Sequence, residues 1–305
     1  MSNSKNILYL ISLMLLMLTG CEAETSLVPF PNEGEEPVEV RFHATTIGAN
    51  VEVSRANYVE QGLETDDKIG IWNEWYNNIK LIYTEGETPN LSIENNGKIY
   101  YPYQTTEMKV FAYAPYSETT FDSEKQIVKV KSEWATNAGL DDYITDPLWA
   151  KATVTQTNTQ ANFGFMHQMA RLKIYLVHNS QKEYTAHSIT FIFDRLQYGK
   201  MFLQTGKIES AAIGDADYHE SYSVNHTLVS KTNTGMPQYD HTVIPGTTLK
   251  QIDINFTDET TSYTRNYNIN TTFNESGKTY TLIINFENIE NDEYTEKELL
   301  NSPNE

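Results

Sequence analysis

Few residues of this 305-residue chain have the types and spacing that catalysis or metal binding requires. The chain contains one cysteine and seven histidines, and it lacks both the HExxH pattern of zinc hydrolases and the GxSxG pattern of serine hydrolases. Adjacent carboxylates occur at Asp66-Asp67 and Asp141-Asp142, but such pairs are ordinary in turns. We therefore expect a protein that is not an enzyme and that uses no metal or cofactor.

The single cysteine, Cys21, has another chemical role in its sequence context. It follows an apolar run over residues 7–18 that is too short to span a bilayer as a helix. Residues 18–21, Leu-Thr-Gly-Cys, resemble a bacterial lipobox, in which a signal peptidase cuts before the cysteine and the thiol carries a diacylglyceryl group. We expect a signal peptide over residues 1–20 and a lipidated, Pro- and Glu-rich tether over residues 21–37. The alternative is a plain secretory signal with an incidental cysteine.

The charge of the chain and of its tether bears on location and partners. Lys and Arg number 22 against 41 Asp and Glu, a formal charge of −19, which repels phosphate backbones and makes nucleic acid a poor partner. Glu22 and Glu24 follow the cysteine and resemble the sorting signals of surface-exposed lipoproteins in Bacteroidetes-type bacteria. We expect a lipoprotein on the outer face of the cell outer membrane, held in the lipid through acylated Cys21.

An aromatic cluster is the best candidate for ligand contact. Trp72, Trp75 and Tyr76 lie close together in the sequence and could form a platform on which a sugar ring stacks. Aromatic side chains in and beside strands more often fill the core of a sandwich, and that interpretation is the favoured one.

The elements that position these residues are predicted to be strands. Apolar residues alternate with polar ones along most of the chain, and no segment after the signal peptide shows a helical period over three turns. The alternating segments lie at residues 38–42, 69–71, 79–83, 110–114, 172–176, 189–193, 252–256 and 280–286.

Turn-forming residues separate these segments, a spacing that is typical of antiparallel β-sandwiches. We predict an all-β fold of two tandem antiparallel sandwich domains, because one sandwich takes about 100 residues. The predicted domains cover residues 38–157 and 158–290, divided near a polar stretch, and residues 291–305 form a polar tail.

Several segments, taken in order, resemble the Bacteroidetes fimbrillin family of pilin lipoproteins with transthyretin-like domains. After the lipobox, the matching segments are Val38–Ala44, Ser54–Ala56, Asp67–Trp72, Phe111–Tyr116, Pro147–Ala152 and Phe165–Leu172. The resemblance covers about residues 1–200, and the rest of the chain matches only in its strand pattern.

The resemblance implies a pilus subunit or a related adhesin that assembles with other pilus subunits and meets a ligand on a host or bacterial surface. In polymerising members a trypsin-like protease cuts after an arginine that follows the first strand, and a strand of another subunit then fills the exposed groove. Arg55 fits the place of that arginine, with Arg41 second, and Val38, Val40 and Phe42 mark the replaceable strand. The acidic C-terminal segment lacks the alternating pattern of a donor strand, which favours a tip, anchor or accessory subunit.

A different class of function stays open beside this one. A surface-tethered glycan-binding lipoprotein would use the same tether, with Trp72, Trp75 and Tyr76 as its sugar contacts.

Overall fold

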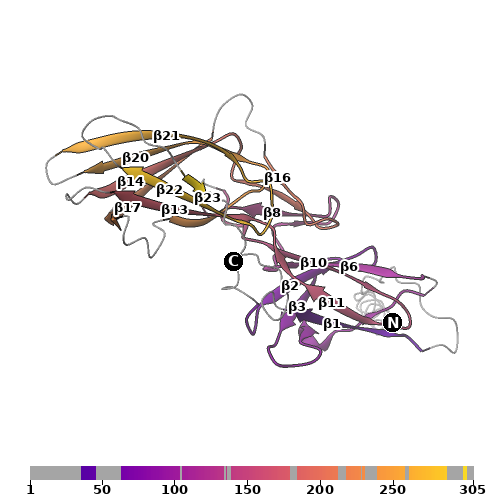
Figure 1. Cartoon of the computed structure of the whole chain (residues 1–305). Coiled ribbons are helices and arrows are strands. Elements are labelled where there is room, and N and C mark those ends of the chain that lie inside the picture. The colour runs from indigo at the N-terminus through magenta and orange to yellow at the C-terminus, as the bar shows by residue number, and fades with distance from the viewer. Residues whose placement is uncertain are drawn as a thin grey trace, which may run out of the picture.

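The computed structural model describes residues 36–45, 63–103, 105–133, 135, 139–178, 184–211, 218–227, 229–230, 239–257, 261–286 and 298–300. Over these ranges the chain contains strands, no α-helix and one 3-10 turn, η1 (Glu94–Asn96) (Figure 1). The predicted all-β fold is confirmed, and every predicted alternating segment overlaps a strand.

The first sheet contains most strands of the N-terminal part of the chain. Its order is β11-β1-β4-β3-β2-β6-β10-β12, and β5 also pairs with β1. The strands are β1 (Glu39–Thr45), β2 (Lys68–Trp72), β3 (Ile79–Tyr83), β4 (Leu91–Ile93), β5 (Ile99–Tyr100), β6 (Met108–Ala114), β10 (Leu148–Val154), β11 (Gln160–Gly164) and β12 (Met166–His167). Strands β11 and β12 extend this sheet beyond residue 157, where we drew a domain boundary, and the division into two domains stays a prediction.

Side-chain alternation gives the first sheet two apolar faces along β6. Val110 and Ala112 point into a core that also contains Ile69, Leu81 and Phe163. The intervening residues of β6 face the other way, toward a second small sheet. Period-two alternation in a strand that is covered on both sides explains why this segment is apolar at nearly every position.

That second sheet, here called the bridging sheet, joins segments from both parts of the chain. Its order is β16-β15-β8-β7, and β9 pairs with β8 in parallel. The strands are β7 (Phe121–Asp122), β8 (Ile127–Lys131), β9 (Ile144–Thr145), β15 (Tyr198–Phe202) and β16 (Ile208–Ser210). Its apolar side packs on Tyr113 of β6 and Trp149 of β10, so it covers part of the outer face of the first sheet.

The remaining strands form two sheets that enclose the third core. One has the order β18-β13-β22-β23 with β19 also on β13, and the other has the order β17-β14-β20-β21. The strands are β13 (Ala170–His178), β14 (Thr185–Phe193), β17 (Tyr218–Thr227), β18 (Val229–Ser230), β19 (Tyr239–Val243), β20 (Thr248–Thr257), β21 (Ser262–Thr272), β22 (Thr279–Phe286) and β23 (Glu298–Leu300).

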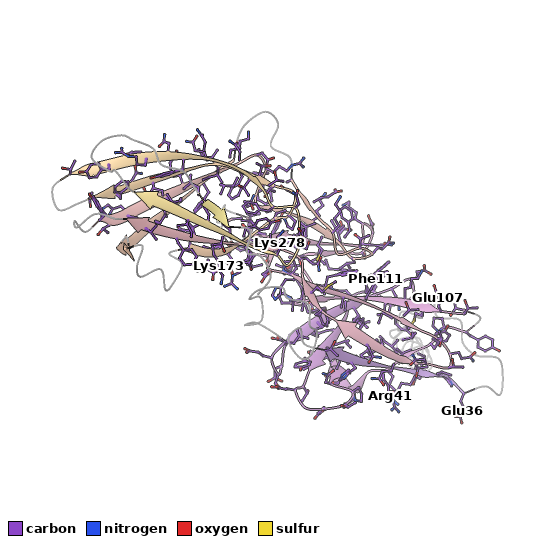
Figure 2. The ribbon with its side chains drawn as sticks, in the orientation of Figure 1. Glu36, Arg41, Glu107, Phe111, Lys173 and Lys278 are labelled. Carbon is purple, nitrogen blue, oxygen red and sulfur yellow. The ribbon has the colours of Figure 1, made fainter. Side chains whose placement is uncertain are left out.

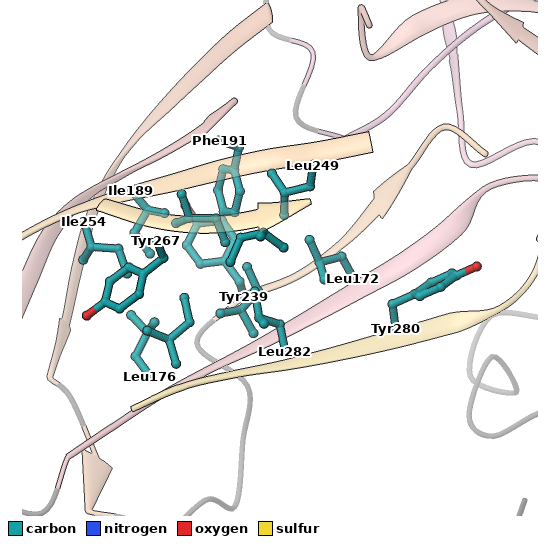
Figure 3. Packing of buried hydrophobic residues seen from close by; sticks show 14 of the residues in the cluster. Leu172, Leu176, Ile189, Phe191, Tyr239, Leu249, Ile254, Tyr267, Tyr280 and Leu282 are labelled. Atoms are coloured by element: carbon teal, nitrogen blue, oxygen red, sulfur yellow. The ribbon is translucent and has the colours of Figure 1, made fainter. Parts of the chain in front are cut away.

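Figure 3 shows how this C-terminal sandwich buries its apolar residues. Leu172 and Leu282 from one sheet face Phe191 and Ile254 from the other, and all four are buried. The first sheet and the C-terminal sandwich lie at opposite ends of the molecule, with β8 and β16 of the bridging sheet between them (Figure 1).

Candidate functional site

Strand β1 presents the alternation that a replaceable strand requires. Val40 and Phe42 are 3% and 2% exposed, and the Phe42 ring stacks on Phe163 with ring centroids 6.2 Å apart. Between them, Arg41 points to solvent on the side of the molecule opposite Phe111 (Figure 2). Fully burying a Val or Phe side chain contributes about 1.5–3 kcal/mol, so two such residues hold β1 firmly.

The backbone of β1 is paired on both sides, but the two sides differ. Residues 41–45 of β1 pair in parallel with residues 160–164 of β11. On the other side β1 meets β4 only where Phe42 faces Leu91, and it meets β5 at Glu39 and Val40. Strand β1 therefore fills a slot between β11 and the short strands β4 and β5.

One side chain completes the pairing where β4 ends. The Ala44 N–H donates to Oδ1 of Asn90 over 2.7 Å, and Nδ2 of Asn90 donates to the Ala44 carbonyl over 2.8 Å. Asn90 is 6% exposed, so this amide acts as a buried substitute for a strand neighbour.

The slot has a clear chemical capability. Without β1, the inner edge of β11 and the edges of β4 and β5 would present unpaired backbone groups beside an apolar floor. A segment with apolar residues at every second position could satisfy both the backbone groups and the floor. Such a segment would replace Val40, Phe42 and Ala44 position by position.

The structure places some of the predicted residues of this region and not others. Val38, just before β1, accepts a hydrogen bond from the Tyr101 N–H over 2.8 Å, so it shares the slot with Val40 and Phe42. Arg41 lies within β1, where its N–H donates to the Thr159 carbonyl over 3.0 Å. Arg55 and the lipidation residue Cys21 lie outside the described residues.

The aromatic candidates Trp72, Trp75 and Tyr76 are divided by the fold. Trp72 is 6% exposed and stacks on Phe111, so it belongs mainly to a core, as the favoured interpretation predicted. Trp72, Trp75 and Phe111 also line a cleft of about 540 Å³ at the edge of the bridging sheet.

Tyr76 does not line that cleft. Its hydroxyl donates to the Tyr100 carbonyl over 3.0 Å and accepts from the Tyr100 N–H over 3.0 Å. Burial raises the pKa of Tyr76, although the bond to the Tyr100 backbone works in the opposite direction. The neutral hydroxyl therefore supports β5, next to the replaceable strand.

Sequence reasoning missed most of the cleft. Its other lining residues come from β6, β10 and the turn after β15: Glu107, Lys109, Phe111, Lys151, Ala152, Thr153, Gln204 and Thr205. These segments are far apart in the sequence, and only the position of Phe111 in an alternating strand gave any signal. Within the described ranges, no three His, Cys, Asp or Glu side chains gather into a metal-binding group.

The fold and the slot define a class: an all-β protein of packed sheets with a buried strand held between a parallel and an antiparallel neighbour. The chain belongs to the fimbrillin-like family, whose model matches residues 54–300.

Solved structures show the same fold. A candidate cell adhesion protein from Bacteroides uniformis is 17% identical with a TM-score of 0.51, covering 82% of this chain and 94% of its own. A second candidate cell adhesion protein, from Bacteroides ovatus, is 18% identical with a TM-score of 0.48, covering 83% and 92%. A fimbrial protein from Bacteroides vulgatus is 14% identical with a TM-score of 0.45, covering 81% and 95%. No curated protein matches the sequence.

Proposed function

We propose that this protein is a non-enzymatic surface lipoprotein that serves as a tip, anchor or accessory subunit of a pilus, or as an adhesin, and assembles by strand addition. The family match supports a pilus subunit or adhesin with a structural role. The observation that carries the assembly step is the seating of β1 between β11 and the short strands β4 and β5. In this proposal the partner is another pilus subunit, whose strand replaces β1.

Proteolysis would begin the exchange, and Arg55 is the proposed cleavage residue. Arg41 supports this choice by its position, because it lies inside a strand whose backbone is hydrogen-bonded on both sides. A protease needs an extended segment that can enter its active site, and a paired central strand does not offer one.

The decisive experiment is mass spectrometry of the N-terminus of surface material. A mature N-terminus at Ala56 supports cleavage after Arg55, and Arg55→Ala should then block both maturation and incorporation into fibres. Arg41→Ala is the matched control and should leave both intact. An N-terminus at Phe42 would instead assign the cut to Arg41, whereas lipidated Cys21 on fibre-bound protein would identify an uncut anchor subunit.

Anchoring through Cys21 is the second part of the proposal. Each buried CH₂ of an acyl chain contributes roughly 0.8 kcal/mol, so two or three chains hold a protein on a membrane. No helix among the described residues is long and apolar enough to cross a bilayer. Cys21→Ser should abolish lipid labelling and release the protein from the outer-membrane fraction, and a variant that still fractionates with the outer membrane would contradict the proposal.

A further inference from the structure

The cleft beside the bridging sheet has a floor that the sheet leaves uncovered. Strands β6 and β10 pair so that Phe111 is opposite Lys151 and Lys109 is opposite Thr153. Further along the same face, Tyr113 and Trp149 are 0% and 6% exposed beneath the bridging sheet. The floor of the cleft is therefore the part of this face that lies beyond the edge of its cover.

One wall is a turn that carries Trp75. Asn73, which is 4% exposed, accepts hydrogen bonds at Oδ1 from the backbone N–H groups of Trp75 (2.8 Å) and Tyr76 (2.7 Å). The Asn73 N–H in turn donates to the Tyr76 carbonyl over 2.9 Å. These bonds and the anchored Tyr76 hydroxyl fix the backbone from which the Trp75 ring projects.

The opposite wall is the turn between β15 and β16, and it is held just as firmly. Nε1 of Trp149 donates to the Leu203 carbonyl over 2.7 Å. Gly206 has φ +72°, and a Cβ there would come within 2.6 Å of the Trp149 ring, so the turn lies flat on the indole. Gln204, at the cleft, is held by a 2.7 Å bond to the Oε1 of Gln126. The cleft is thus formed before any ligand arrives, which lowers the entropic cost of binding.

The chemistry of the lining identifies the class of ligand. Aromatic faces of Trp75 and Phe111 lie beside hydroxyl, amide and charged groups, with two lysines balanced by Glu74 and Glu107. A pyranose ring combines an apolar C–H face, which stacks on aromatic rings, with a rim of hydroxyl groups that need hydrogen-bond partners.

Two observations set a saccharide apart from a peptide strand. Phe111 is paired on both sides, with Trp72 of β2 and with Lys151 of β10, so β6 offers no free edge for strand addition at this point. Lys109 lies 3.2 Å from Glu107, whereas Lys151 forms no ion pair within the described part of the chain. Its ammonium group is available to the oxygens of a ligand.

We propose that this cleft binds a saccharide, with a sugar ring stacked on Trp75 and its oxygens contacted by Lys151. The proposal names the ligand of the adhesive part of the proposed function and rests on that part. It does not require cleavage or strand exchange.

The test is binding by the full uncut chain, kept in solution with a detergent that has no sugar headgroup. An array of neutral, sialylated and uronate-containing oligosaccharides is probed first, and the strongest array ligand is then titrated by calorimetry. We expect Trp75→Ala to weaken binding by about fivefold or more. Trp75→Phe, which keeps a ring, should restore most of it.

Matched controls separate the cleft from the rest of the surface. Tyr175→Ala removes a half-buried aromatic ring from β13, and Lys200→Ala removes an exposed lysine from β15 outside the cleft; neither should change the affinity. Lys151→Ala, an exposed position that does not threaten folding, should weaken binding a few-fold.

Absence of binding across the array would overturn the proposal, as would an affinity that Trp75→Ala and Lys151→Ala leave unchanged. Because the chain is uncut, either result would leave the Arg55 experiment unaffected. Conversely, a failed cleavage experiment would not touch a positive binding result.

Discussion

Asn90 does for β1 what a neighbouring strand would otherwise do. Its amide matches the spacing of a backbone peptide group and satisfies both the N–H and the C=O of Ala44. The sequence offered no hint of this role, because an asparagine between strands is usually a turn residue.

We predict that Asn90→Ala destabilises the protein by about 1–3 kcal/mol, because two buried backbone groups lose their partners. Urea denaturation followed by tryptophan fluorescence would measure the change. Asn77→Ala, at an exposed position in a nearby loop, is the control and should stay within about 0.5 kcal/mol. Equal effects of the two substitutions would contradict the role assigned to Asn90.

Gly70 is required by a close approach between two strands. A Cβ at this position would lie 2.2 Å from Cε1 of Tyr113, a fully buried residue whose hydroxyl lies 2.6 Å from Oδ1 of Asn78. We expect Gly70→Ala to cost about 1–3 kcal/mol through overpacking, read as a lowered melting temperature. Gly164→Ala is the matched control, since its nearest neighbour would be the Thr45 hydroxyl at 3.8 Å. A melting temperature that Gly70→Ala leaves unchanged would refute the packing argument.

At the scale of elements, β1 depends on its inward side chains. We predict that Phe42→Ala destabilises the uncut protein by about 3–5 kcal/mol, because it leaves a cavity beside Phe163. Arg41→Ala, the next residue along, should change stability by less than about 0.5 kcal/mol. Chemical denaturation of both variants would test this. Similar losses in the two would mean that β1 is held by its backbone alone.

The strands themselves follow from local pattern, whereas their partners do not. Alternation at Ile252, Ile254 and Phe256 is a property of a short segment, and it correctly predicts both strand β20 and its inward face. The pairing of β1 with β11 depends on how the chain returns after more than a hundred residues, which no local pattern encodes.

The candidate sites show the same limit. Val40 and Phe42 were identified because the replaceable strand is a local feature that also resembles a known family. The cleft combines Trp75, Phe111 and Gln204 from segments that only the folded sheets bring together. Tyr76 was grouped with Trp75 by sequence proximity, but adjacent side chains leave the backbone in different directions.

At the scale of the whole molecule, a polar contact joins the segment after β8 to the C-terminal sandwich. Oε2 of Glu133 lies 3.1 Å from Nδ1 of His241 and accepts the Thr242 N–H over 3.2 Å. Burial opposes ionisation of Glu133, but the bonds from His241 and Thr242, helped by the charge of Arg171, outweigh it and lower the pKa of this carboxyl.

This shift predicts a dependence of stability on pH. A lowered folded-state pKa stabilises the protein above the unfolded-state value, and the contribution is lost as pH falls through the folded-state value. The stability difference between wild type and Glu133→Gln should therefore be largest near pH 6 and shrink toward pH 3, with a maximum of about 1 kcal/mol for so exposed a group.

Urea titrations at the two pH values would measure this difference. Glu209→Gln, at an exposed position on β16, is the control and should show no such trend. A difference for Glu133→Gln that stays constant between pH 6 and pH 3 would rule out the linkage.

The parallel pairing of β1 with β11 also has a consequence for the order of synthesis. Thr45 and Phe163, joined across this pair, are 118 positions apart in the chain. A polypeptide that emerges with its N-terminus first exposes Val40 and Phe42 long before their neighbours on β11 have been made. During that interval the strand is open to chaperones and to other nascent chains. The strand that is synthesised first is therefore among the last to reach its native place.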